Sequence, residues 1–538
     1  MEIEQLSDAC NILANLNREQ TNNHNFCFLI NNILPFASCV SQQPVAKKLP
    51  LHSYQNISSI IFIMNRKTFL YQSGAASLGL MTPRILKAAM PPGDFTSKRP
   101  PIADRNFTSA AVEATIMKMK KIIMDPEVAW LFENCFPNTL DTTVFFKMID
   151  GRPDTFVITG DIHAMWLRDS SAQVWPYLPL LNKDEKLKQL IAGVINRQTK
   201  CILIDPYANA FNDGPTGSEW DKDITAMKPE LHERKWEVDS LCYPIRLAYN
   251  YWKKTADISP FYSKWKEAMQ LVVKTFKQQQ RKHDRGPYTF GRTTSWSTDT
   301  VPGDGYDNPI KPVGLIVSVF RPSDDATIFP FLIPSNFFAV TSLRQLATMS
   351  SDILKDENFA NECNALANEV DAALKKYAAA THLQFGEIYA YEVDGFGNRL
   401  FMDDSNVPSL LSLSYLGSVT TNNTIYQNTR KFILSDSNPY FFKGKYAEGS
   451  GSPHTLEDKI WPMSIILRAI TSTSDSEITH CIRMLKDTNA GTGFMHESFN
   501  KDDPKDFTRK WFAWANTLFG EMILKVYHEH PGILAKEI

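Results

Sequence analysis

Apolar residues recur at helical spacing along most of the chain, starting near residue 109. In each of about a dozen windows they fall near positions i, i+3, i+4 and i+7, a pattern that gives an α-helix one apolar face. The body of the protein is therefore predicted to be mostly helical. The predicted helices are 109–123, 126–135, 170–181, 184–200, 244–254, 260–279, 336–349, 357–379, 420–434, 456–471, 475–487 and 508–527.

Two β-hairpins are predicted between the helices, each leading into an acidic loop. Each has a two-residue Asp-Gly turn signal between runs of strand-forming residues. The first pairs 144–149 with 155–159 and leads to Gly160-Asp161; the second pairs 387–393 with 399–402 and leads to 403–406. Helices joined by long polar loops predict an all-α ring of paired helices, with a site built from loops at one end. The ring is expected from the number of elements, because the sequence has no clean internal repeat.

The first hundred residues differ from the rest in composition. Residues 1–63 are rich in Asn, and the basic and small apolar run from Met64 to Leu80 has the form of a signal peptide. We expect Met64 to be the functional start, with 1–63 an over-extended or disordered segment, and the protein to be periplasmic or secreted. The alternative is an ordinary disordered N-terminal extension. Proline pairs predict a linker over 91–107, which completes a region 64–107 ahead of a catalytic body at 108–538.

Charge and cysteine content narrow the classes of function. The chain has 57 Lys+Arg and 59 Asp+Glu, with no long basic run, which argues against nucleic acid or an acidic membrane surface as the main partner. No apolar run reaches the length of about 18 residues that a membrane span requires. The eight cysteines form no CxxC pair and are expected to be small buried apolar residues. The 11 tryptophans fit a sugar-binding cleft or a large aromatic core equally well.

The stretch 159–179 concentrates chemistry-bearing residues. Asp161, His163, Trp166, Arg168 and Asp169 lie within nine positions of one another. An indole face beside an Arg-Asp pair suits a neutral, hydroxyl-rich ligand, because the ring packs on C–H faces and the charged pair binds hydroxyls. The alternative is an ion pair next to a core tryptophan.

Several other segments are rich in carboxylates and aromatic residues. Glu237 and Asp239 precede a predicted helix start at Pro244, so either could be a helix-capping acid instead of a catalytic one. Asp304, Asp307 and Asn308 do not fit the spacing of an EF-hand, so no metal site is expected. The chain has no P-loop, nucleophile elbow, zinc-binding His-Glu-x-x-His or dinucleotide-binding glycine motif. Glycosidic hydrolysis needs two carboxyl groups, and the sequence offers too many candidates to choose between by chemistry alone.

The order and length of these motifs resemble glycoside hydrolase family 125. The resemblance covers about residues 108–530 and rests on GDIHAMWLRDS at 160–170, EVDSLCY at 237–243, FRPSDD at 320–325, MDDSNVPSLL at 402–411, GSPHT at 451–455, MHESF at 495–499 and WFAWAN at 511–516. It implies an (α/α)6 barrel, exo-acting α-1,6-mannosidase activity, inversion at the anomeric carbon and no metal or other cofactor. The alternatives are another (α/α)6 exo-glycosidase, such as a glucosidase, and a non-catalytic glycan-binding protein.

The resemblance also implies roles for individual residues. Asp239 would be the general acid and Glu497 the general base. The sugar-binding residues would be Arg168, Asp169, Asp403, Asp404, His496 and Trp514. Arg321, Asp324, Asp325 and His454 are expected in the cleft without an assigned role. The implied partner is a mannose-containing oligosaccharide or glycan, with no nucleic acid and no integral membrane segment, and the oligomeric state is left open.

Overall fold

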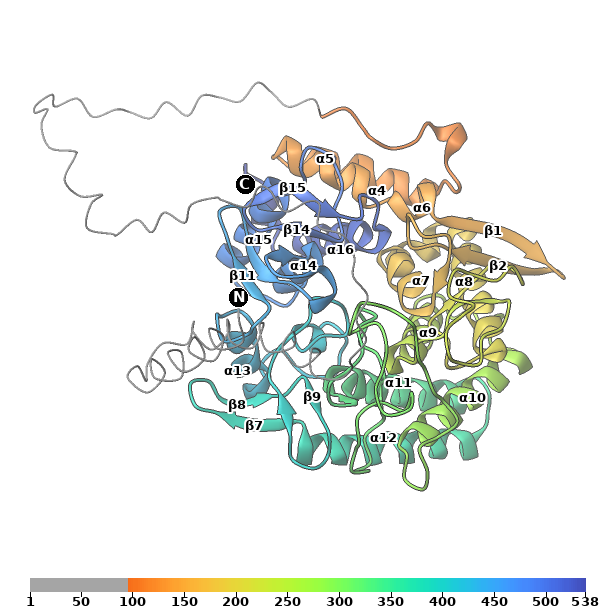
Figure 1. The fold of residues 1–538 in the computed structure, drawn as a ribbon. Helices are drawn as coiled ribbons and strands as arrows, with labels where there is room; N and C mark the ends of the chain where they lie inside the picture. Colours follow the sequence, from red (N-terminus) through yellow and green to blue (C-terminus); the bar gives the residue numbers. More distant parts are fainter. Residues whose placement is uncertain (1–94) are drawn as a thin grey trace, which may run out of the picture. The chain divides into compact units, whose positions relative to one another are not determined.

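Six helical elements close into a ring at the centre of the protein, in a computed structural model that describes residues 95–538 (Figure 1). Each element packs against the next, and the last returns to the first. In order they are α7 (Leu167–Val174), α9 (Val238–Thr255), α11 (Ile333–Asp352), the 3-10 helix η3 (Leu411–Leu413), α14 (Pro462–Ile470) and α16 (Ala513–Glu529).

A second layer of helices surrounds this ring. It consists of α5 (Pro126–Cys135), α8 (Glu185–Ile204), α10 (Ser263–Gln279), α12 (Glu357–Tyr377), α13 (Thr424–Ile433) and α15 (Asp475–Asp487). Outer and inner elements alternate along the chain, and each outer helix packs on the ring or on its outer neighbour. The protein is thus an (α/α)6 barrel, as the family resemblance implied, and it has the ring of paired helices expected from the number of elements. The remaining helices are α4 (Ala110–Ile122), α6 (Asn138–Thr142), α17 (Pro531–Leu534), η1 (Ile102–Asp104), η2 (Trp175–Lys183) and η4 (Pro453–Thr455).

The two layers differ in sequence because they differ in what covers them. All eight residues of α7 are buried, polar ones included. By contrast, α12 buries one apolar stripe that includes Phe359, Leu366 and Val370, and it carries Lys375 and Lys376 in its last turn. A helix covered on all sides needs buried polar groups with partners, whereas an outer helix needs only one apolar face.

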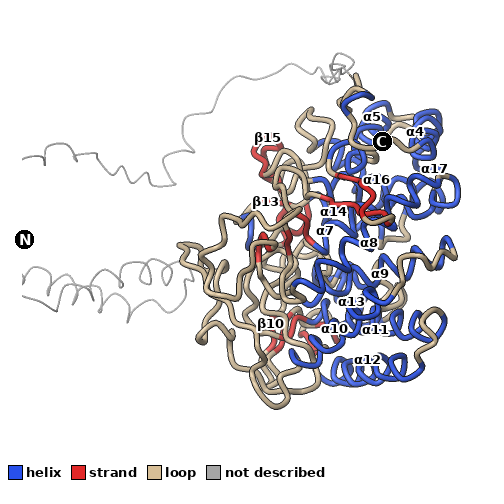
Figure 2. The backbone as a smooth tube through the Cα atoms, turned by 90° about the vertical axis from the view of Figure 1, so that its right-hand side faces the viewer, coloured by secondary structure: helices blue, strands red, loops and turns tan. Residues whose placement is uncertain are grey.

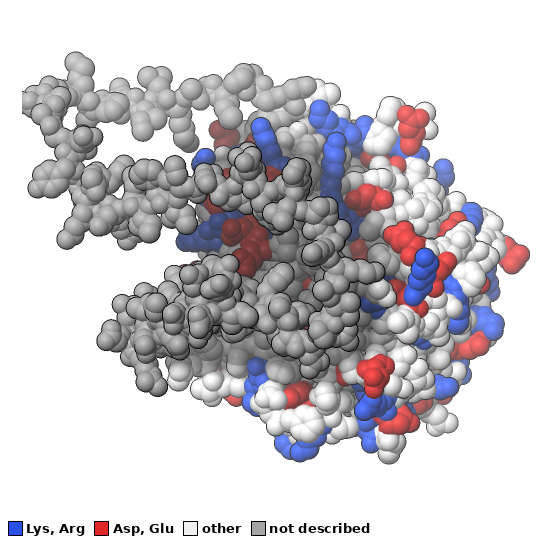
Figure 3. All heavy atoms as spheres, viewed as in Figure 1, with Lys and Arg blue, Asp and Glu red and all other residues white. Residues whose placement is uncertain are grey.

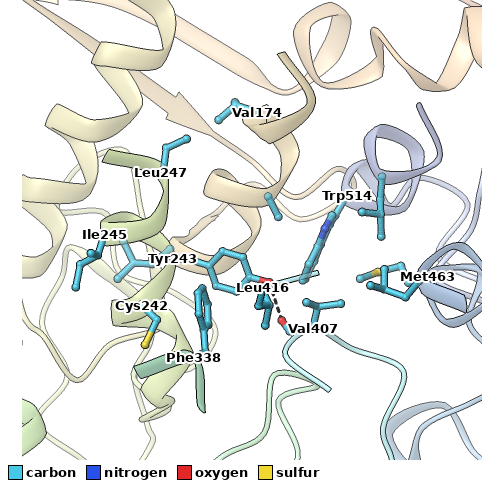
Figure 4. Close-up of a cluster of buried hydrophobic side chains, with 14 of the residues drawn as sticks. Val174, Cys242, Tyr243, Ile245, Leu247, Phe338, Val407, Leu416, Met463 and Trp514 are labelled. Atoms are coloured by element: carbon cyan, nitrogen blue, oxygen red, sulfur yellow. Dashed lines mark hydrogen bonds between the residues drawn. The ribbon is translucent and has the colours of Figure 1, made fainter. Parts of the chain in front are cut away.

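An aromatic cluster fills the inside of the ring (Figure 4). The ring of Tyr243 on α9 packs edge-on against Phe338 of α11, with centroids 5.1 Å apart, and against Trp514 of α16, 6.1 Å apart. The Tyr243 hydroxyl donates a hydrogen bond to the carbonyl oxygen of Val407 at 2.9 Å. This bond satisfies the polar end of a buried tyrosine, and the three rings tie inner helices together beneath the loops.

Short strands and long loops gather at one end of the barrel (Figure 2). The strands form two- and three-stranded antiparallel sheets, ordered β1-β2, β3-β4-β5, β10-β9-β6, β7-β8, β11-β12 and β13-β14-β15. Their bounds are β1 (Val144–Ile149), β2 (Arg152–Val157), β3 (Met165–Trp166), β4 (Ala210–Phe211), β5 (Leu231–Glu233), β6 (Phe331–Leu332), β7 (Ala379–His382), β8 (Gly386–Tyr389), β9 (Glu392–Val393), β10 (Arg399–Leu400), β11 (Phe441–Lys443), β12 (Glu448–Ser450), β13 (Lys459–Ile460), β14 (Ser498–Asn500) and β15 (Asp503–Thr508).

The first predicted hairpin is confirmed and the second is confirmed in part. Strands β1 and β2 pair around Asp150-Gly151, whose φ angles of 51° and 75° suit a primed hairpin turn. Strands β9 and β10 pair around the turn at Asp394-Gly395. However, the segment before β9 does not join them, because β8 pairs with the preceding strand β7.

The helix boundaries agree best at the outer layer. Helices α5 and α15 have the predicted bounds, whereas α9 begins at Val238 instead of 244 and contains Pro244 in its interior. The proline signal therefore misplaced this start, and Asp239 lies in the first turn of α9. The predicted helix 170–181 begins earlier, as α7, and continues as the 3-10 helix η2, which contains Pro176 and Pro179.

The predictions for the N-terminal region fall mainly outside the described residues. The expected extension 1–63, the signal-like run from Met64 and the first part of the linker belong to residues 1–94. The part of the linker that is described packs on the body, because Arg99 pairs with Asp141 at 2.7 Å and Trp130 donates to the carbonyl of Thr96 at 2.7 Å. No helix within 95–538 has the length and apolarity to cross a membrane.

Surface charge and cysteines agree with the expectations for the described region. Lys and Arg are interspersed with Asp and Glu on the described part of the face in Figure 3. The five cysteines in this region, Cys135, Cys201, Cys242, Cys363 and Cys481, are all buried and free.

Candidate active site

A cavity of about 480 Å³ lies among the loops and the first turns of the inner helices. Five tryptophans and a phenylalanine line it together with charged residues. Residues at its surface include Trp166, Arg168, Asp169, Trp220, Glu233, Lys235, Arg292, Trp296, Asp299, Ser323, Asp324, Asp325, His454, Glu497, Arg509 and Trp514. Apolar ring faces beside hydrogen-bonding charges suit a sugar, which has both C–H faces and hydroxyls.

The stretch 159–170 enters the cavity through a strand and a helix start. Strand β3 pairs with β4, and this pairing holds Trp166 directly before α7. Arg168 and Asp169 then lie in the first turn of α7. Gly160 has a φ of 131°, and a Cβ there would come within 2.3 Å of the Trp511 carbonyl oxygen, so only glycine permits this close approach.

A hairpin brings Glu497 and Arg509 together from opposite ends. Glu497 directly precedes β14 and Arg509 directly follows β15, and these strands pair with Ser498 opposite Thr508. Arg509 Nη1 lies 3.5 Å from Glu497 Oε1, and its Nε donates to Asp161 Oδ1 at 2.8 Å. One guanidinium thus joins the two segments and faces the carboxylate of Glu497.

Arg168 is surrounded by four carboxyl groups. Its guanidinium pairs with Glu237, and it lies 3.3 Å from Asp239, 3.5 Å from Asp169 and 3.6 Å from Asp324. Burial raises the pKa of Asp169 to about 6 against the opposing effect of Arg168. Burial also raises the pKa values of Glu237 and Asp239, again opposed by Arg168. One positive charge does not balance four negative ones, so the cluster holds protons that isolated carboxyls would release.

Asp324 is the member of this cluster that combines contact with the cavity and solvent access. Its side chain is 25% exposed, compared with 0% for Glu237 and Asp239. It sits in a tight turn where Arg321 donates to the Asp325 carbonyl at 2.8 Å, and its φ is 68°. A left-handed residue other than glycine stores about 1–3 kcal/mol of strain, and such strain concentrates at functional sites.

Lys235 and Arg292 organise another part of the wall. Lys235 is buried and lies 3.3 Å from Glu233 and 2.7 Å from Asp299. Arg292 lies 3.0 Å from Glu233 and 3.6 Å from the centroid of the Trp220 ring. Their positive charges neutralise Glu233 and Asp299, so these two carboxylates are held in ion pairs.

Four of the eight predicted site residues line the cavity and four do not. Arg168, Asp169, Glu497 and Trp514 are at its surface. Asp239, Asp403, Asp404 and His496 are buried outside the lining. The structure places these four outside the cavity lining, and their roles in catalysis and substrate binding stay predictions.

The physical reason differs for each of the four. Asp239 is turned below the cavity, where it accepts hydrogen bonds from Arg168 and from Ser335 at 3.2 Å. Asp403 accepts the backbone N–H groups of Leu410 and Leu411. Asp404 accepts from the hydroxyls of Ser323 and Ser452, and the His496 ring stacks on Phe507 with centroids 3.8 Å apart. These side chains hold loops in place.

Three of the four residues expected in the cleft without a role are there. Asp324, Asp325 and His454 line the cavity. His454 lies 3.6 Å from Asp325, which raises the pKa of the imidazole to about 9 even though burial opposes this. The fourth, Arg321, is buried in an ion pair with Glu392 at 2.6 Å.

Sequence reasoning missed several lining residues. Trp220, Arg292 and Trp296 come from long loops without a strong local motif, and Glu233 is the last residue of the short strand β5. The only signal was the length of the loop between Gln279 and Ile333, since long structured loops are often functional.

The chemistry that the arrangement permits is transfer of a proton and activation of water by carboxyl groups. Within residues 95–538, no group of three or more His, Cys, Asp or Glu side chains has the geometry to hold a metal ion. Asp307, a candidate for calcium, accepts a hydrogen bond from Thr327 at 2.9 Å.

Comparison with known proteins gives two close relatives and a family. The family described as metal-independent α-mannosidase, GH125, matches residues 125–524. Meiotically up-regulated gene 157 protein of Schizosaccharomyces pombe is 42% identical over 458 residues, which cover 82% of this chain and 90% of that protein. A solved metal-independent α-mannosidase of Streptococcus pneumoniae, in a non-productive complex with α-1,6-mannobiose, is 40% identical with a TM-score of 0.75, over 78% of this chain and 98% of that chain.

Proposed function

The chain belongs to glycoside hydrolase family 125, the metal-independent α-mannosidases, and from this we propose that it removes terminal α-1,6-linked mannose from the non-reducing ends of glycans with inversion. The observation that carries the linkage is the Streptococcus pneumoniae relative, whose complex contains α-1,6-mannobiose. An inverting hydrolase needs one carboxylate that activates water and one carboxylic acid that protonates the leaving oxygen.

Glu497 is the proposed base. Its carboxylate lines the cavity and faces Arg509 at 3.5 Å, with the His454 imidazole also contributing positive charge nearby. Positive neighbours favour the ionised form of a carboxyl group, which is the form that takes a proton from water. In the reaction, Glu497 removes a proton from the water as the water attacks the anomeric carbon.

Asp324 replaces Asp239 as the proposed acid. A general acid must reach the glycosidic oxygen, and the fully buried carboxyl of Asp239 has no access to the cavity. Glu233, Asp299 and Asp325 line the cavity but are held by Lys235, Arg292 and His454. Asp324 lines the cavity beside Glu237. Arg168 and Lys235 lower the pKa of Asp324, whereas burial raises the pKa of Glu237, so a proton is held next to Asp324.

Asp169 has a different place in this scheme. Its raised pKa of about 6 would suit an acid. However, the positive charge of Arg509, the guanidinium that faces Glu497, also acts on Asp169, which places Asp169 near the base. The acid and the base of an inverting enzyme act from opposite faces of the sugar, so Asp169 suits a hydroxyl-binding role beside Arg168. Trp514 supplies an apolar surface for the ring.

Hydrolysis of three mannobioses tests the proposed function. The purified protein is incubated with the α-1,2, α-1,3 and α-1,6 isomers and with an α-glucoside, and released sugar is quantified. We expect mannose from the α-1,6 isomer in clear preference to the others. Preference for the glucoside would favour another (α/α)6 exo-glycosidase, and binding of mannobiose without turnover would favour a glycan-binding protein.

A further inference from the structure

Glu237 is a buried carboxyl group that is neither the proposed acid nor the proposed base. It occupies the N-cap position of α9, but its side chain makes no capping hydrogen bond. Its Oε2 accepts from Arg168 and from the Ser240 hydroxyl, the latter at 2.7 Å. Its Oε1 is buried and has no hydrogen-bond donor among the described protein groups.

The carboxyl groups of Glu237 and Asp324 both lie against the guanidinium of Arg168, and a side-chain hydrogen bond between them raises the pKa of Glu237 and lowers that of Asp324. Two ionised carboxylates are both acceptors, so a hydrogen bond between them requires a proton. A proton on Glu237 is consistent with its buried Oε1, to which no described group donates. Two interacting carboxyls titrate as a pair, and the pair retains its last proton to a higher pH than either would alone.

The surroundings decide where this proton rests when no sugar is bound. Burial favours protonation of both groups, but Arg168 and Lys235 lower the pKa of Asp324. Glu237 is faced by Arg168 of α7, by Asp239 of α9 and by Asp324, and burial raises its pKa well above the usual value. His454 adds positive charge near Asp324. The proton therefore rests on Glu237, one carboxyl away from the cavity.

We propose that Glu237 is a positioning residue that holds the proton which Asp324 delivers to the leaving sugar. The inference rests on the proposed function. As the glycosidic C–O bond breaks, its electron pair goes to the leaving oxygen. Glu237 passes its proton to the ionised carboxylate of Asp324, and Asp324 gives this proton to the leaving oxygen. Water supplies the new bond to the anomeric carbon and gives its proton to Glu497. Both members of the pair are left ionised, and the partly exposed Asp324 recovers a proton from solvent.

Glu237→Gln separates this role from a structural one. The glutamine keeps the size and can donate to Asp324, but it has no acidic proton and it stabilises the ionised form of Asp324. We expect turnover of α-1,6-mannobiose to fall about 10- to 100-fold at pH 7, the range of general-acid effects, and the alkaline limb of its pH profile to move to lower pH. An aryl α-mannoside with a good leaving group needs little protonation and should be hydrolysed within about threefold of wild type.

Asp239→Asn is the matched control. Asp239 is as buried as Glu237, lies near it at the start of α9 and also contacts Arg168, but its hydrogen bonds are to Arg168 and Ser335 and not to Asp324. We expect this variant to change the turnover of both substrates by the same factor and to leave the alkaline limb of the pH profile unshifted. Circular dichroism confirms that both variants are folded.

The outcomes of the two proposals are distinct. If wild type fails to hydrolyse α-1,6-mannobiose, the proposed function is overturned. If the wild-type protein is active and Glu237→Gln lowers the turnover of both substrates equally without shifting the pH profile, then Glu237 is structural. That result overturns the inference. If Glu237→Gln does not fold, Ser240→Ala provides the second test, because loss of its hydrogen bond to Glu237 should shift the same alkaline limb, and an unshifted limb would also overturn the inference.

Discussion

Carboxyl groups on two sides of the cavity have opposite electrostatic surroundings. On the side of the β14-β15 hairpin, Glu497 faces the guanidinium of Arg509, with positive charge from His454 nearby. On the side of α7 and α9, Asp324 shares a single arginine with three other carboxyls. The first arrangement favours an ionised carboxylate. In the second, burial raises the pKa values of Asp169, Glu237 and Asp239, so protons are retained by the carboxyls beside Asp324.

This difference teaches how one fold prepares a base and an acid from the same functional group. The environment of each carboxyl, and not its residue type, separates the two tasks. Four changes test this comparison, in order of decreasing effect on turnover.

Glu497→Gln should have the largest effect. The amide cannot take a proton from water, so turnover should fall about 10²- to 10⁴-fold with both mannobiose and an activated aryl mannoside. Steady-state kinetics with both substrates provide the measurement, and calorimetric binding of mannobiose checks that the cavity is intact. Near-wild-type rates would move the base to another acid.

Asp324→Asn should lower mannobiose turnover about 10²- to 10³-fold but spare the activated aryl mannoside in part, because a good leaving group needs little protonation. The ratio of the two rates, compared with the same ratio for Glu497→Gln, separates acid from base. Equal losses on both substrates would remove Asp324 from the acid role, and Asp169→Asn would then be examined in the same way.

Trp296→Ala should have a smaller effect, on binding. The indole lines the cavity and is 42% exposed, which leaves a face free for a sugar. An aromatic contact is worth about 0.5–1.5 kcal/mol, so KM should rise about 2- to 10-fold with kcat nearly unchanged. Ile328→Ala is the control, because Ile328 lies on the same loop and is similarly exposed but does not line the cavity. If Ile328→Ala raised KM as much as Trp296→Ala does, a sugar contact at Trp296 would be contradicted.

Asp307→Asn should leave turnover unchanged and alter stability. Burial raises the pKa of Asp307 from 3.8 to about 7, although Thr327 and the Asn308 N–H donate to it. The folded protein therefore binds this proton more tightly than the unfolded chain, and the stability that protonation contributes is lost as the pH rises from about 4 through about 7.

Asparagine stays neutral and tolerates the φ of 73° at this position. The variant should gain up to the order of 4 kcal/mol in unfolding free energy at pH 8, and the gain should shrink toward pH 4. Denaturant unfolding at the two pH values measures this. A constant difference across the range would show that Asp307 is not protonated in the fold, and a fall in turnover would mean that this carboxyl also serves the reaction.

The sequence predicted most of the helices because their apolar residues recur at helical spacing, but it missed the ring member η3 (Leu411–Leu413), which is too short to show a period. It was least accurate at α9, where Pro244 reads as a helix start although the helix begins at Val238. That shift of the helix start hid the orientation of Asp239, whose carboxyl points below the cavity toward Ser335.

Three of the predicted residues that line the cavity lie next to short strands. Arg168 and Asp169 follow a strand directly, and Glu497 precedes one. Asp403 looked equally suitable, but its carboxylate accepts backbone N–H groups from Leu410 and Leu411, a loop closure that spacing does not reveal. The facing pair of Glu497 and Arg509 depends on strand register, which the sequence did not specify because 508–512 was predicted to be helical.

The stereochemistry of the first-formed sugar tests the central claim most directly. If Glu497 activates a water while Asp324 protonates the leaving oxygen, the water attacks from the face opposite the leaving group. Proton NMR of α-1,6-mannobiose hydrolysis, recorded before the anomers equilibrate, should show β-mannose first. First-formed α-mannose would mean that a carboxylate attacks the sugar itself, and it would contradict the account.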